Sequence, residues 1–356
     1  MLDLDSKSNI RILTSPRFED QQKSILKNLE PKNLTDHFIL LSSGTTSSEL
    51  KGFALSHHAL ITNAEAVNSH FALTPNDVWG LSLPSYHVGG LSVLIRAHLL
   101  QNRVVEFQDW EPLSWVHTLE TEKVTITTVV PTQVYDLVKM NLTAPSHLRY
   151  LIVGGDFLSD ALEEKAVALG WPVIRTFGMT EVCSQLASAK TTGPKNLDVL
   201  SPHHVKTDNN QRLLVKSECL FTLKFIQTDR FKIIEAAELC DKDGYFLSHD
   251  RVELHGNTVT PLGRLDDMIK ISGRLISLLE MKNLIERATL EQGIFQKAEI
   301  AIEEDERKGK KIVLYHLPEV NSPQLLEKYL LPIKIDEFRE VTSLQRTDLG
   351  KLKKNQ

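Results

Sequence analysis

Phosphate chemistry is the first possibility that the residue types suggest, because hydroxyls, glycines and one lysine are concentrated in SSGTTSSELKG, residues 42–52. This stretch follows the apolar run 38–41 and precedes a segment with helical periodicity, so we expect a turn between a strand and a helix. In such a turn, backbone N–H groups surround phosphate oxygens and Lys51 adds a positive charge. The spacing differs from the GxxxxGK[ST] phosphate loop, so a polar surface turn is an equally good interpretation of the stretch alone.

A second stretch, FGMTE at residues 177–181, follows the apolar residues 172–174 and places a hydroxyl next to a carboxylate. At the end of a strand, Thr180 can offer its hydroxyl to a phosphate oxygen. Glu181 can offer its carboxylate to Mg²⁺, which prefers oxygen ligands. Alone, the GMTE pattern is weak.

Two charged stretches lie nearer the C-terminus. The stretch GRLDDMIKISGR at 263–274 is densely charged and contains two framing glycines, as expected of a hinge that also contacts a ligand. The stretch QRTDLGK at 345–351 is a fourth candidate segment near the C-terminus. The alternatives are a charged surface linker and a solvated basic tail.

The elements that must position these residues follow an α/β pattern, because short β-branched runs alternate with helical periodicity from residue 38 onward. Ser56 can cap a helix, Pro131 can start one, and Asp160 with Glu163 resembles a capping box. The predicted helices lie near 20–29, 56–67, 91–100, 131–140 and 160–169, and the predicted strands near 78–83, 103–107, 124–130 and 148–153.

From about residue 212 the pattern changes to alternating apolar runs, which predict antiparallel strands. We therefore place a smaller β-rich subdomain at about 200–262. The remainder of the chain is long enough for a separate small α/β domain.

Composition excludes several classes of protein. A chain of 356 residues with 41% hydrophobic residues can bury a large core in two or three domains. A net charge of -5 without a long Lys/Arg block argues against a nucleic-acid or membrane-surface protein. Three cysteines without C-x-x-C spacing suggest neither disulfides nor zinc. With no signal peptide or apolar membrane span, the sequence predicts a soluble cytoplasmic protein.

In combination, the motifs SSGTT…KG, PSYHVGG, FGMTE, SHD, GRLDDMIKISG and RTDLGK resemble, in this order, those of the acyl-adenylate-forming (AMP-binding) family. That family comprises acyl-CoA synthetases, luciferases and nonribosomal adenylation domains, and the resemblance covers about residues 38–354. It implies an α/β fold with a large N-terminal region, 1–265, that includes the β-rich subdomain. A hinge joins this region to a small mobile C-terminal α/β domain, 266–356.

The resemblance also implies roles in nucleotide binding. Thr180 would contact the α-phosphate of ATP, Glu181 would bind Mg²⁺, and Phe177 would lie against adenine. Asp250 would accept hydrogen bonds from both ribose hydroxyls, and Arg264 would contact the ribose and a phosphate. The residues that would hold the β- and γ-phosphates are Ser43, Gly44, Thr45, Thr46 and Lys51.

For the acyl group, His87 would gate the pocket, while Gly154 and Gly155 would leave room for the acyl group or the adenine. Lys351 would enter the site during adenylation, where charge develops on the carboxylate and the α-phosphate. Within the family, segments 84–91 and 178–185 most resemble the branch that joins o-succinylbenzoate to coenzyme A in menaquinone biosynthesis.

The implied reaction has two halves. A substrate carboxylate attacks the α-phosphorus of Mg-ATP, pyrophosphate leaves, and an acyl-adenylate results. The C-terminal domain then rotates about Asp266 and presents Lys270 and Gly273, so that the thiol of coenzyme A can attack the carbonyl. The expected partners are therefore a small carboxylic acid, ATP and coenzyme A. The sequence leaves the oligomeric state open, with a homodimer as one alternative.

The phosphate loop departs from the usual SGTTG-x-P-K-G pattern: Ser47 replaces a glycine, Glu49 replaces a proline, and Lys51 comes one residue late. Two other functions remain open. One is a CoA ligase for another aromatic or short acyl acid, and the other is a non-catalytic protein that binds a nucleotide or an acyl-adenylate.

Three residue types outside the motifs allow a structural and a functional interpretation. Arg96 can pair with a second substrate carboxylate, but we expect it on a helix surface. Cys183 is expected in the core, and the His203-His204 pair is expected in a solvated turn rather than in a metal site.

Overall fold

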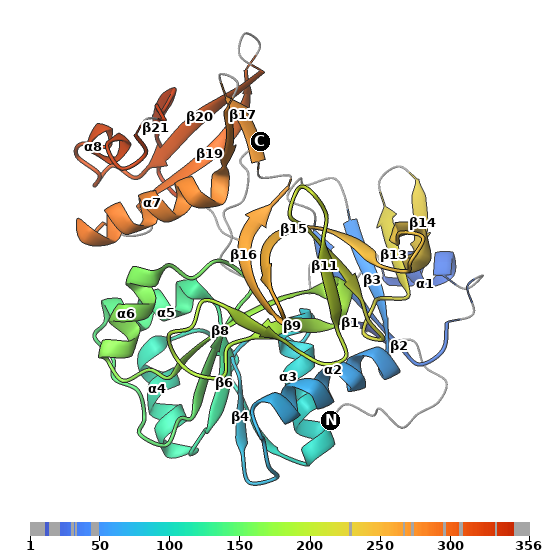
Figure 1. Cartoon of the computed structure of the whole chain (residues 1–356). Helices are drawn as coiled ribbons and strands as arrows, with labels where there is room; N and C mark the ends of the chain where they lie inside the picture. Colours follow the sequence, from blue (N-terminus) through green and yellow to red (C-terminus); the bar gives the residue numbers. More distant parts are fainter. Residues whose placement is uncertain are drawn as a thin grey trace.

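The computed structural model describes residues 11–13, 22–29, 32, 34–43, 50–227, 230–265, 268–271, 274–294, 297–305, 309–331 and 333–344. Within these residues the strands form two large sheets and two small ones (Figure 1). The helices of this part of the chain are all too short or too polar to cross a membrane.

The largest sheet combines parallel and antiparallel strands, in the order β11-β12-β15-β16-β10-β9-β8-β7-β6-β4-β5. Neighbours from β5 to β8 pair in parallel, and neighbours from β8 to β11 pair antiparallel. The predicted α/β fold class is confirmed. The strands are β4 (Val78–Leu81), β5 (Arg103–Glu106), β6 (Ile126–Val129), β7 (Tyr150–Val153), β8 (Val173–Met179), β9 (Ser184–Ser188), β10 (Leu197–Val199), β11 (His204–Thr207), β12 (Arg212–Lys216), β15 (Phe246–His255) and β16 (Thr258–Arg264).

Helices cover both faces of the parallel strands, as a parallel sheet requires. Alternate residues of β7 show the division. Ile152 packs in an apolar cluster with α2 and α3, whereas Leu151 and Val153 pack in a second cluster with α4, α5 and α6 (Figure 1). Of these helices only α4, with its buried residues Trp115 and Leu119, was not predicted. The helices are α2 (His57–His70), α3 (Val88–Leu100), α4 (Pro112–Thr121), α5 (Pro131–Lys139) and α6 (Asp160–Ala168).

The helix starts predicted from the sequence are correct at two positions and wrong at a third. Ser56 caps α2, its Oγ accepting a hydrogen bond of 3.1 Å from the backbone N–H three residues on, and Pro131 begins α5. The predicted capping box at Asp160 is wrong by one residue, because Ser159 is the N-cap of α6. The Asp160 carboxylate instead pairs with Arg175, 3.0 Å away.

The second sheet, in the order β1-β2-β3-β13-β14, carries the predicted phosphate loop. Strands β2 and β3 pair antiparallel, so residues 44–49 connect two strands and the helix begins only at residue 57. The predicted strand-to-helix turn is therefore wrong. Residues 50–56 form a strand because Phe53 and Leu55 pack on one face of the sheet and Ala54 on the other. The elements are β1 (Arg11–Leu13), β2 (His37–Ser43), β3 (Leu50–Ser56), β13 (Leu223–Gln227), β14 (Phe231–Glu235) and α1 (Gln22–Leu29), which packs on the Ala54 face.

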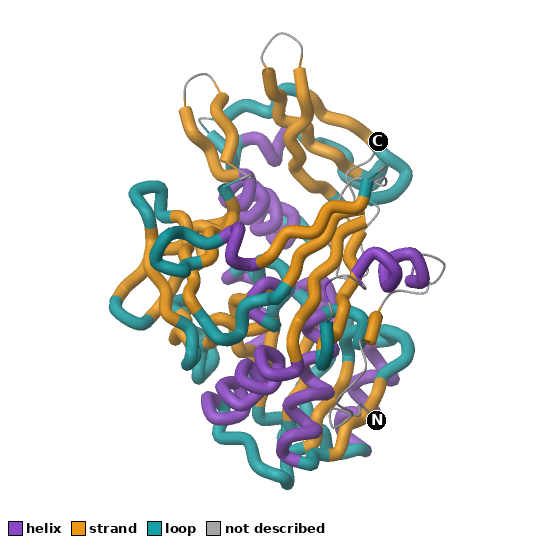
Figure 2. The backbone as a smooth tube through the Cα atoms, turned by 90° about the vertical axis from the view of Figure 1, so that its right-hand side faces the viewer, coloured by secondary structure: helices purple, strands orange, loops and turns teal. Residues whose placement is uncertain are grey.

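The C-terminal part has its own core and lies above the rest of the chain in both views (Figure 1 and Figure 2). Helix α7 packs on one face of a three-stranded sheet, with Met281 and Ile285 against Ile300 and Leu314. At its other end, Leu290 of α7 joins the apolar cluster of α4, α5 and α6. The domain boundary at residue 265 stays a prediction. The elements are β17 (Met268–Ile271), β18 (Arg274–Ser277), α7 (Leu278–Glu291), β19 (Ala298–Asp305), β20 (Gly309–His316), α8 (Gln324–Glu327) and β21 (Glu337–Glu340).

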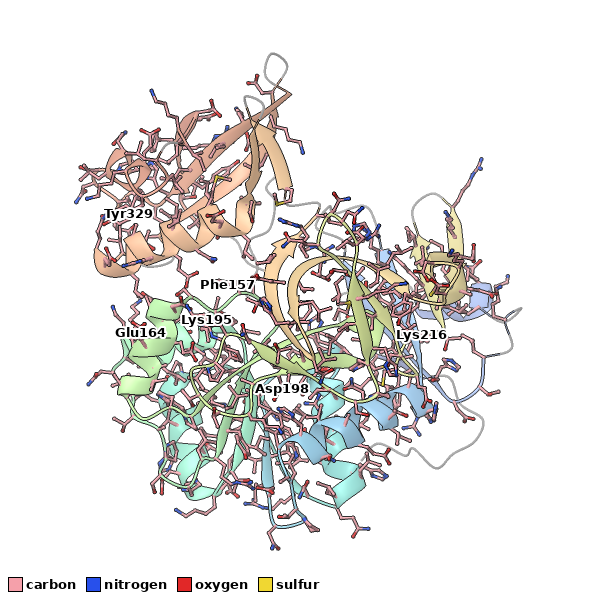
Figure 3. The ribbon with its side chains drawn as sticks, in the orientation of Figure 1. Phe157, Glu164, Lys195, Asp198, Lys216 and Tyr329 are labelled. Atoms are coloured by element: carbon pink, nitrogen blue, oxygen red, sulfur yellow. The ribbon has the colours of Figure 1, made fainter. Side chains whose placement is uncertain are left out.

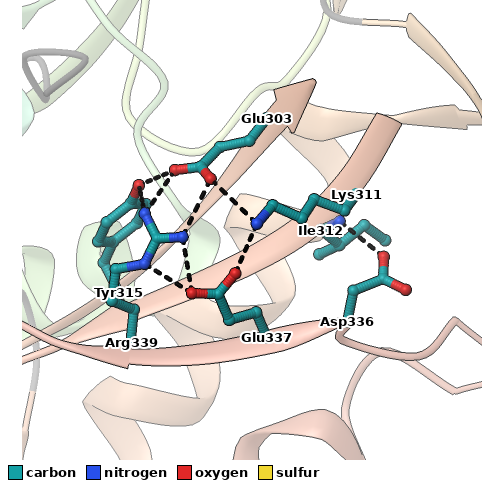
Figure 4. Close-up of polar contacts among 7 residues, drawn as sticks. All are labelled: Glu303, Lys311, Ile312, Tyr315, Asp336, Glu337 and Arg339. Atoms are coloured by element: carbon teal, nitrogen blue, oxygen red, sulfur yellow. Dashed lines mark hydrogen bonds and ion pairs between the residues drawn. The ribbon is translucent and has the colours of Figure 1, made fainter. Parts of the chain in front are cut away.

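The other face of that three-stranded sheet carries a charged network (Figure 4). Arg339 on β21 donates to Glu303 on β19 at 2.9 Å and to Glu337 at 2.7 Å, and Lys311 on β20 donates to Glu337 at 2.6 Å. Burial, followed by the nearby Glu303 carboxylate, raises the pKa of Tyr315 to about 12. The network thus links all three strands through their side chains.

Candidate active site

The site begins at the carboxyl ends of the parallel strands, where open α/β sheets bind their ligands. Strand β8 ends at Met179 and continues directly into a short 3₁₀ turn, Thr180–Val182. The backbones of β8 and β9 approach each other closely at Gly178. A Cβ atom on this residue would lie only 1.8 Å from the carbonyl oxygen of Ser184. Glycine at 178 therefore allows the tight return that presents Thr180 and Glu181 at the end of the strand.

The charges around Glu181 come from three other segments. Burial raises the pKa of the Glu181 carboxyl, and the negative charge of Asp250 acts in the same direction. The positive charges of Lys224 and Arg264 oppose this rise. The environment is therefore one in which a further cation would stabilise the carboxylate.

Magnesium fits this donor set. Mg²⁺ is commonly held by one or two carboxylates together with substrate phosphates. Glu181 supplies one carboxylate oxygen donor, beside the hydroxyl of Thr180. Within the described ranges of the chain, no cluster of three or more His, Cys, Asp or Glu side chains is arranged to hold a metal.

Asp250 and Arg264 lie opposite each other in the β15–β16 hairpin, with Asp250 Oδ1 and Arg264 Nη1 3.7 Å apart. Ser248 fixes the backbone beneath them. Its hydroxyl is buried, donates to the carbonyl of Leu213 at 2.9 Å and accepts from the N–H of Asp250 at 3.1 Å. The Asp250 carboxylate and the Arg264 guanidinium are thereby held side by side where the pairing of the two strands of the hairpin ends. The charges of both groups act on the pKa of Glu181.

The predicted acyl-pocket residues follow strand β7 and begin helix α3. Gly154 and Gly155 follow β7, and the N–H of Gly154 donates to the carbonyl of Val129 at 3.2 Å. Gly155 has a φ of 83°. Phe157, just beyond this turn, lies between the larger part of the chain and the C-terminal part (Figure 3). His87 is the N-cap of α3, and its ring centroid lies 4.8 Å from that of Tyr86.

The phosphate loop is described only at its base. Gly44, Thr45 and Thr46 lie outside the described residues, and Ser43 is described as the last residue of β2 without its side chain. Lys51 is half-buried on β3, opposite Ser42.

The residues predicted for the hinge and for adenylation are described even less than the phosphate loop. Asp266, Gly273 and Lys351 lie outside the described residues, and Lys270 is described only by its backbone in β17. Their roles remain predictions.

Arg96 is buried inside the protein. The prediction that it lies on a helix surface is wrong. Only 1% of it is exposed, and burial lowers its pKa to about 9. Its Nη2 lies 3.5 Å from Ser184 Oγ, and its guanidinium carbon lies 5.9 Å from the centre of the Trp79 ring. Among the described residues, its Nε has no hydrogen-bond partner. In the part of the chain that the structure describes, no carboxylate lies within ion-pair distance of it.

The sequence did contain a signal for this burial. Helix α3, VGGLSVLIRAHLL, is apolar on nearly all sides, and such a helix is buried rather than amphipathic. It packs against both α2 and the large sheet, with Val93 and Ala97 in the same apolar cluster as Trp79. An arginine in the middle of this helix therefore has to be buried as well.

Two further predictions about single residues have opposite outcomes. Cys183 is fully buried in the core, as expected. His203 is not in a solvated turn, because both ring nitrogens have partners inside the protein: Ser217 Oγ at 2.9 Å and the carbonyl of Gln185 at 3.1 Å. Burial, helped by the charge of the neighbouring His204 and opposed by the hydrogen bond to Gln185, lowers the pKa of His203 to about 4.

A mixed sheet in which strand β8 leads into Thr180 and Glu181, beside a hairpin that carries Asp250 and Arg264, agrees with the arrangement that the resemblance implies for an adenylate-forming enzyme. The sequence model of the family described as AMP-binding enzyme matches residues 4–208, more than half of the chain. The chain belongs to the AMP-binding enzyme family.

Curated relatives include 2-succinylbenzoate--CoA ligases. The protein of that name from Staphylococcus epidermidis strain ATCC 12228 is 27% identical over 333 residues, covering 89% of this chain and 68% of the relative. The one from Staphylococcus aureus strain Newman is 25% identical over 366 residues, covering 95% of this chain and 72% of the relative. The chain thus spans about two thirds of the length of these relatives.

Solved structures confirm the predicted fold. O-succinylbenzoate CoA synthetase (MenE) from Bacillus subtilis, in complex with the acyl-adenylate intermediate OSB-AMP, has a TM-score of 0.74 at 22% identity, with 88% of this chain and 67% of that chain covered. The same enzyme in complex with ATP and a magnesium ion has a TM-score of 0.75 at 20% identity, with 97% and 78% covered.

Proposed function

We propose that this chain joins o-succinylbenzoate to coenzyme A in an ATP-dependent reaction that passes through an acyl-adenylate. Membership of the AMP-binding family and the similarity to 2-succinylbenzoate--CoA ligases support the reaction type. The observation that carries the choice of acid is Arg96, a buried arginine beside the segment that follows Thr180.

o-Succinylbenzoate has two carboxylates, and only one of them is activated by ATP. The other must be desolvated when the acid enters a closed pocket, so it needs a buried cation. Arg96 is such a cation, and a ligand carboxylate would restore the pairing that its burial removes. An acid with a single carboxylate would leave this arginine without an anionic partner. Arg96 therefore favours a dicarboxylic substrate.

The other residues would act as their positions suggest. The loop from Ser43 to Thr46, with Lys51, would hold the β- and γ-phosphates. Phe177 would face the adenine, and Asp250 with Arg264 would hold the ribose. Glu181 would bind Mg²⁺, which when bound neutralises phosphate charge.

His87 would gate the acyl pocket at the start of α3. Gly154 and Gly155 would keep side chains away from the bound acyl group. These assignments place the acid between α3 and the ends of β7 and β8.

In the first half-reaction, a carboxylate oxygen of the acid would bond to the α-phosphorus as the bond to pyrophosphate breaks. Thr180 would hold the α-phosphate, and Lys351 would stabilise the charge that develops there. In the second half-reaction, rotation about Asp266 would withdraw Lys351 and bring Lys270 and Gly273 to the site. The thiol of coenzyme A would then attack the acyl carbonyl and release AMP.

The test is a panel of acids assayed for pyrophosphate release and for CoA thioester. o-Succinylbenzoate should give both products, whereas benzoate and short monocarboxylic acids should give little. In Arg96→Met, the ratio of kcat/KM for o-succinylbenzoate to that for benzoate should fall by about 100-fold, because the second carboxylate loses its cation. Thermal stability should not fall, since methionine removes an unpaired buried charge.

Arg103→Met is the matched control, because Arg103 pairs with Glu122 on the surface at 2.6 Å. Its selectivity should equal that of the wild type. A strong preference for another acid would favour the alternative ligase. ATP binding by calorimetry, without a product from any acid, would favour the non-catalytic alternative.

A further inference from the structure

The second sheet carries a lysine that the motifs do not include. Strands β3 and β13 are antiparallel, with Phe53 opposite Lys224 and Lys51 opposite Ile226. Directly opposite residues of an antiparallel pair project to the same side of the sheet. Lys51, Phe53 and Lys224 therefore share one side, which we call the Phe53 face.

The register that places Lys224 there is strongly fixed. A Cβ atom on Gly52 would lie 2.1 Å from Cζ of the Phe225 ring, so the ring occupies the space that only glycine leaves free. On that opposite side, Phe225 packs in a buried cluster with Ile39 and Leu41. A shift of one residue would move Lys224 into this apolar cluster and Phe225 out of it. The position of Lys224 on the Phe53 face is therefore specified by the core.

The Phe53 face is turned toward the candidate active site. The N–H of Phe221, three residues before Lys224, donates to the carbonyl of Glu181 at 3.0 Å. The rings of Phe221 and Phe53 meet edge to face, with centroids 5.4 Å apart. Lys224 Nζ lies 5.8 Å from the centre of the Phe53 ring, and its charge acts on the Glu181 carboxylate. Lys224 is thus close to the residue expected to bind Mg²⁺.

Lys224 has no ion-pair partner within 4.0 Å among the residues that the structure describes. It is half-buried, so part of its hydration is already lost. A positive charge in this position is stabilised by an anion that enters the site. In an adenylate-forming enzyme, the anion with the highest charge is the triphosphate of ATP.

The phosphate loop is attached to the same face. Residues 44–49 connect β2 to β3, and Lys51 is the second residue of β3. Lys51 and Lys224 are diagonal neighbours on adjacent strands, so their Cα atoms are about 7–8 Å apart, within joint reach for long side chains. We propose that Lys224 is a second cationic ligand for the β- and γ-phosphates of ATP, acting with Lys51 from the adjacent strand. The proposal rests on the proposed function and deepens it.

This arrangement would offset the irregular loop, in which Glu49 adds a negative charge and Lys51 is displaced by one residue. During adenylation, the bond from the α-phosphorus to the bridging oxygen breaks and pyrophosphate carries away the electron pair. Lys224 would stabilise this leaving group. AMP lacks the β- and γ-phosphates, so Lys224 should contribute to the binding of ATP and pyrophosphate but not to that of AMP.

The experiment compares nucleotide affinities by calorimetry with the full chain. Lys224→Met keeps an unbranched stem beside the Phe53 ring and removes the charge. It should weaken the binding of ATP and of pyrophosphate by about tenfold, as expected for a charge-assisted contact, and change AMP binding by less than about twofold. Lys224→Arg should stay within about threefold of the wild type for all three ligands, because the charge is retained.

Lys242→Met is the matched control, since Lys242 is an exposed lysine in the turn before β15. It should bind all three ligands as the wild type does. Equal losses for AMP and ATP in Lys224→Met would show a packing role and overturn the proposal, and so would unchanged ATP binding. A wild-type protein that binds no ATP would instead overturn the proposed function, a result that differs from either of these.

Discussion

Asp250 and Arg264 lie directly opposite each other on β15 and β16, with Asp250 Oδ1 and Arg264 Nη1 3.7 Å apart. They are held by the hairpin register and by the buried hydroxyl of Ser248, which lies two residues before Asp250. A carboxylate has lone pairs for several donors, so Asp250 can accept hydrogen bonds from a ligand while the guanidinium stays beside it. This geometry suits a ribose with two neighbouring hydroxyls.

Asp250→Asn should weaken the binding of ATP and AMP to the same extent, because the ribose is common to both. A loss of about 10- to 100-fold is expected, since the neutral amide keeps one acceptor oxygen instead of two and loses the charge that strengthens hydrogen bonds to a carboxylate. Calorimetric titrations with the two nucleotides measure it. Glu253→Gln is the control on the same strand, an exposed residue that pairs with His255 at 3.1 Å. A loss confined to ATP would rule out ribose recognition by Asp250.

Lys351→Ala should slow adenylation by about 10²- to 10³-fold, because charge on the transferring phosphoryl group loses its stabilisation. The conversion of supplied acyl-adenylate to CoA thioester should keep its wild-type rate. The two half-reactions are measured separately, by pyrophosphate release and by thioester formation. Lys353→Ala, two residues further along the chain, serves as the control. Unchanged pyrophosphate release in Lys351→Ala would refute the assigned role.

The buried His203 should make stability depend on pH. Its pKa falls from 6.5 in the unfolded chain to about 4 in the folded protein, chiefly through burial, so the unfolded state binds more protons between these values. The stability that the neutral ring of His203 contributes to the folded state is fully present above pH 6.5 and is lost as the pH falls toward 4. The free energy of unfolding in urea should lose up to about 3 kcal/mol from this residue.

His203→Gln offers a comparison without a titrating ring. The difference in unfolding free energy between wild type and variant should shrink as the pH is lowered from 7.5 to 4.5. A difference that is constant across this range would show that His203 is protonated equally in both states.

The network around Arg339 should stabilise the C-terminal part more than a single ion pair does. Arg339→Met leaves Glu303 and Glu337 close together without the guanidinium between them, and should lower the unfolding free energy by about 1–2 kcal/mol. The loss should be smaller in high salt, because the network is partly exposed and screened.

Lys282→Met provides the comparison, as Lys282 forms one ion pair, with Glu299 at 3.2 Å. Its loss should be below about 1 kcal/mol. Equal losses of unfolding free energy in Arg339→Met and Lys282→Met would mean that the network adds no stability beyond that of a single ion pair.

Local chemistry explains which parts of the fold could be predicted from the sequence. Ser56 and Pro131 mark helix starts through their own hydrogen bonding and ring geometry, so a single sequence is enough to find them. The burial of Cys183, and the parallel strands that alternate with helices, could be predicted from the pattern of apolar residues. The order of the motifs then predicts the family, which the match to residues 4–208 confirms.

What could not be predicted depends on distant partners. Strand β3 pairs not only with β2 but also with β13, more than 160 residues later, and no local pattern around Lys51 reports this distant partner. His203 is buried because Ser217 and Gln185 satisfy both ring nitrogens. The roles of the residues in the predicted site also remain to be tested, since a motif specifies residue types but not the ligand that they hold.

The strand order of the two large sheets has a consequence for biosynthesis. Strand β10 gains β16 as a neighbour only when Thr258 and Val259 have been made, and β3 gains β13 only after residue 227. A nascent chain that has been made as far as β10 contains the parallel strands β4 to β8, yet its β10 and β3 edges still lack the partners that later residues supply. Such unpaired edges are sites of aggregation. A fragment ending before β13 would retain the complete phosphate-loop sequence yet leave both edges open, so loss of the later hairpins would first appear as insolubility rather than as weak catalysis.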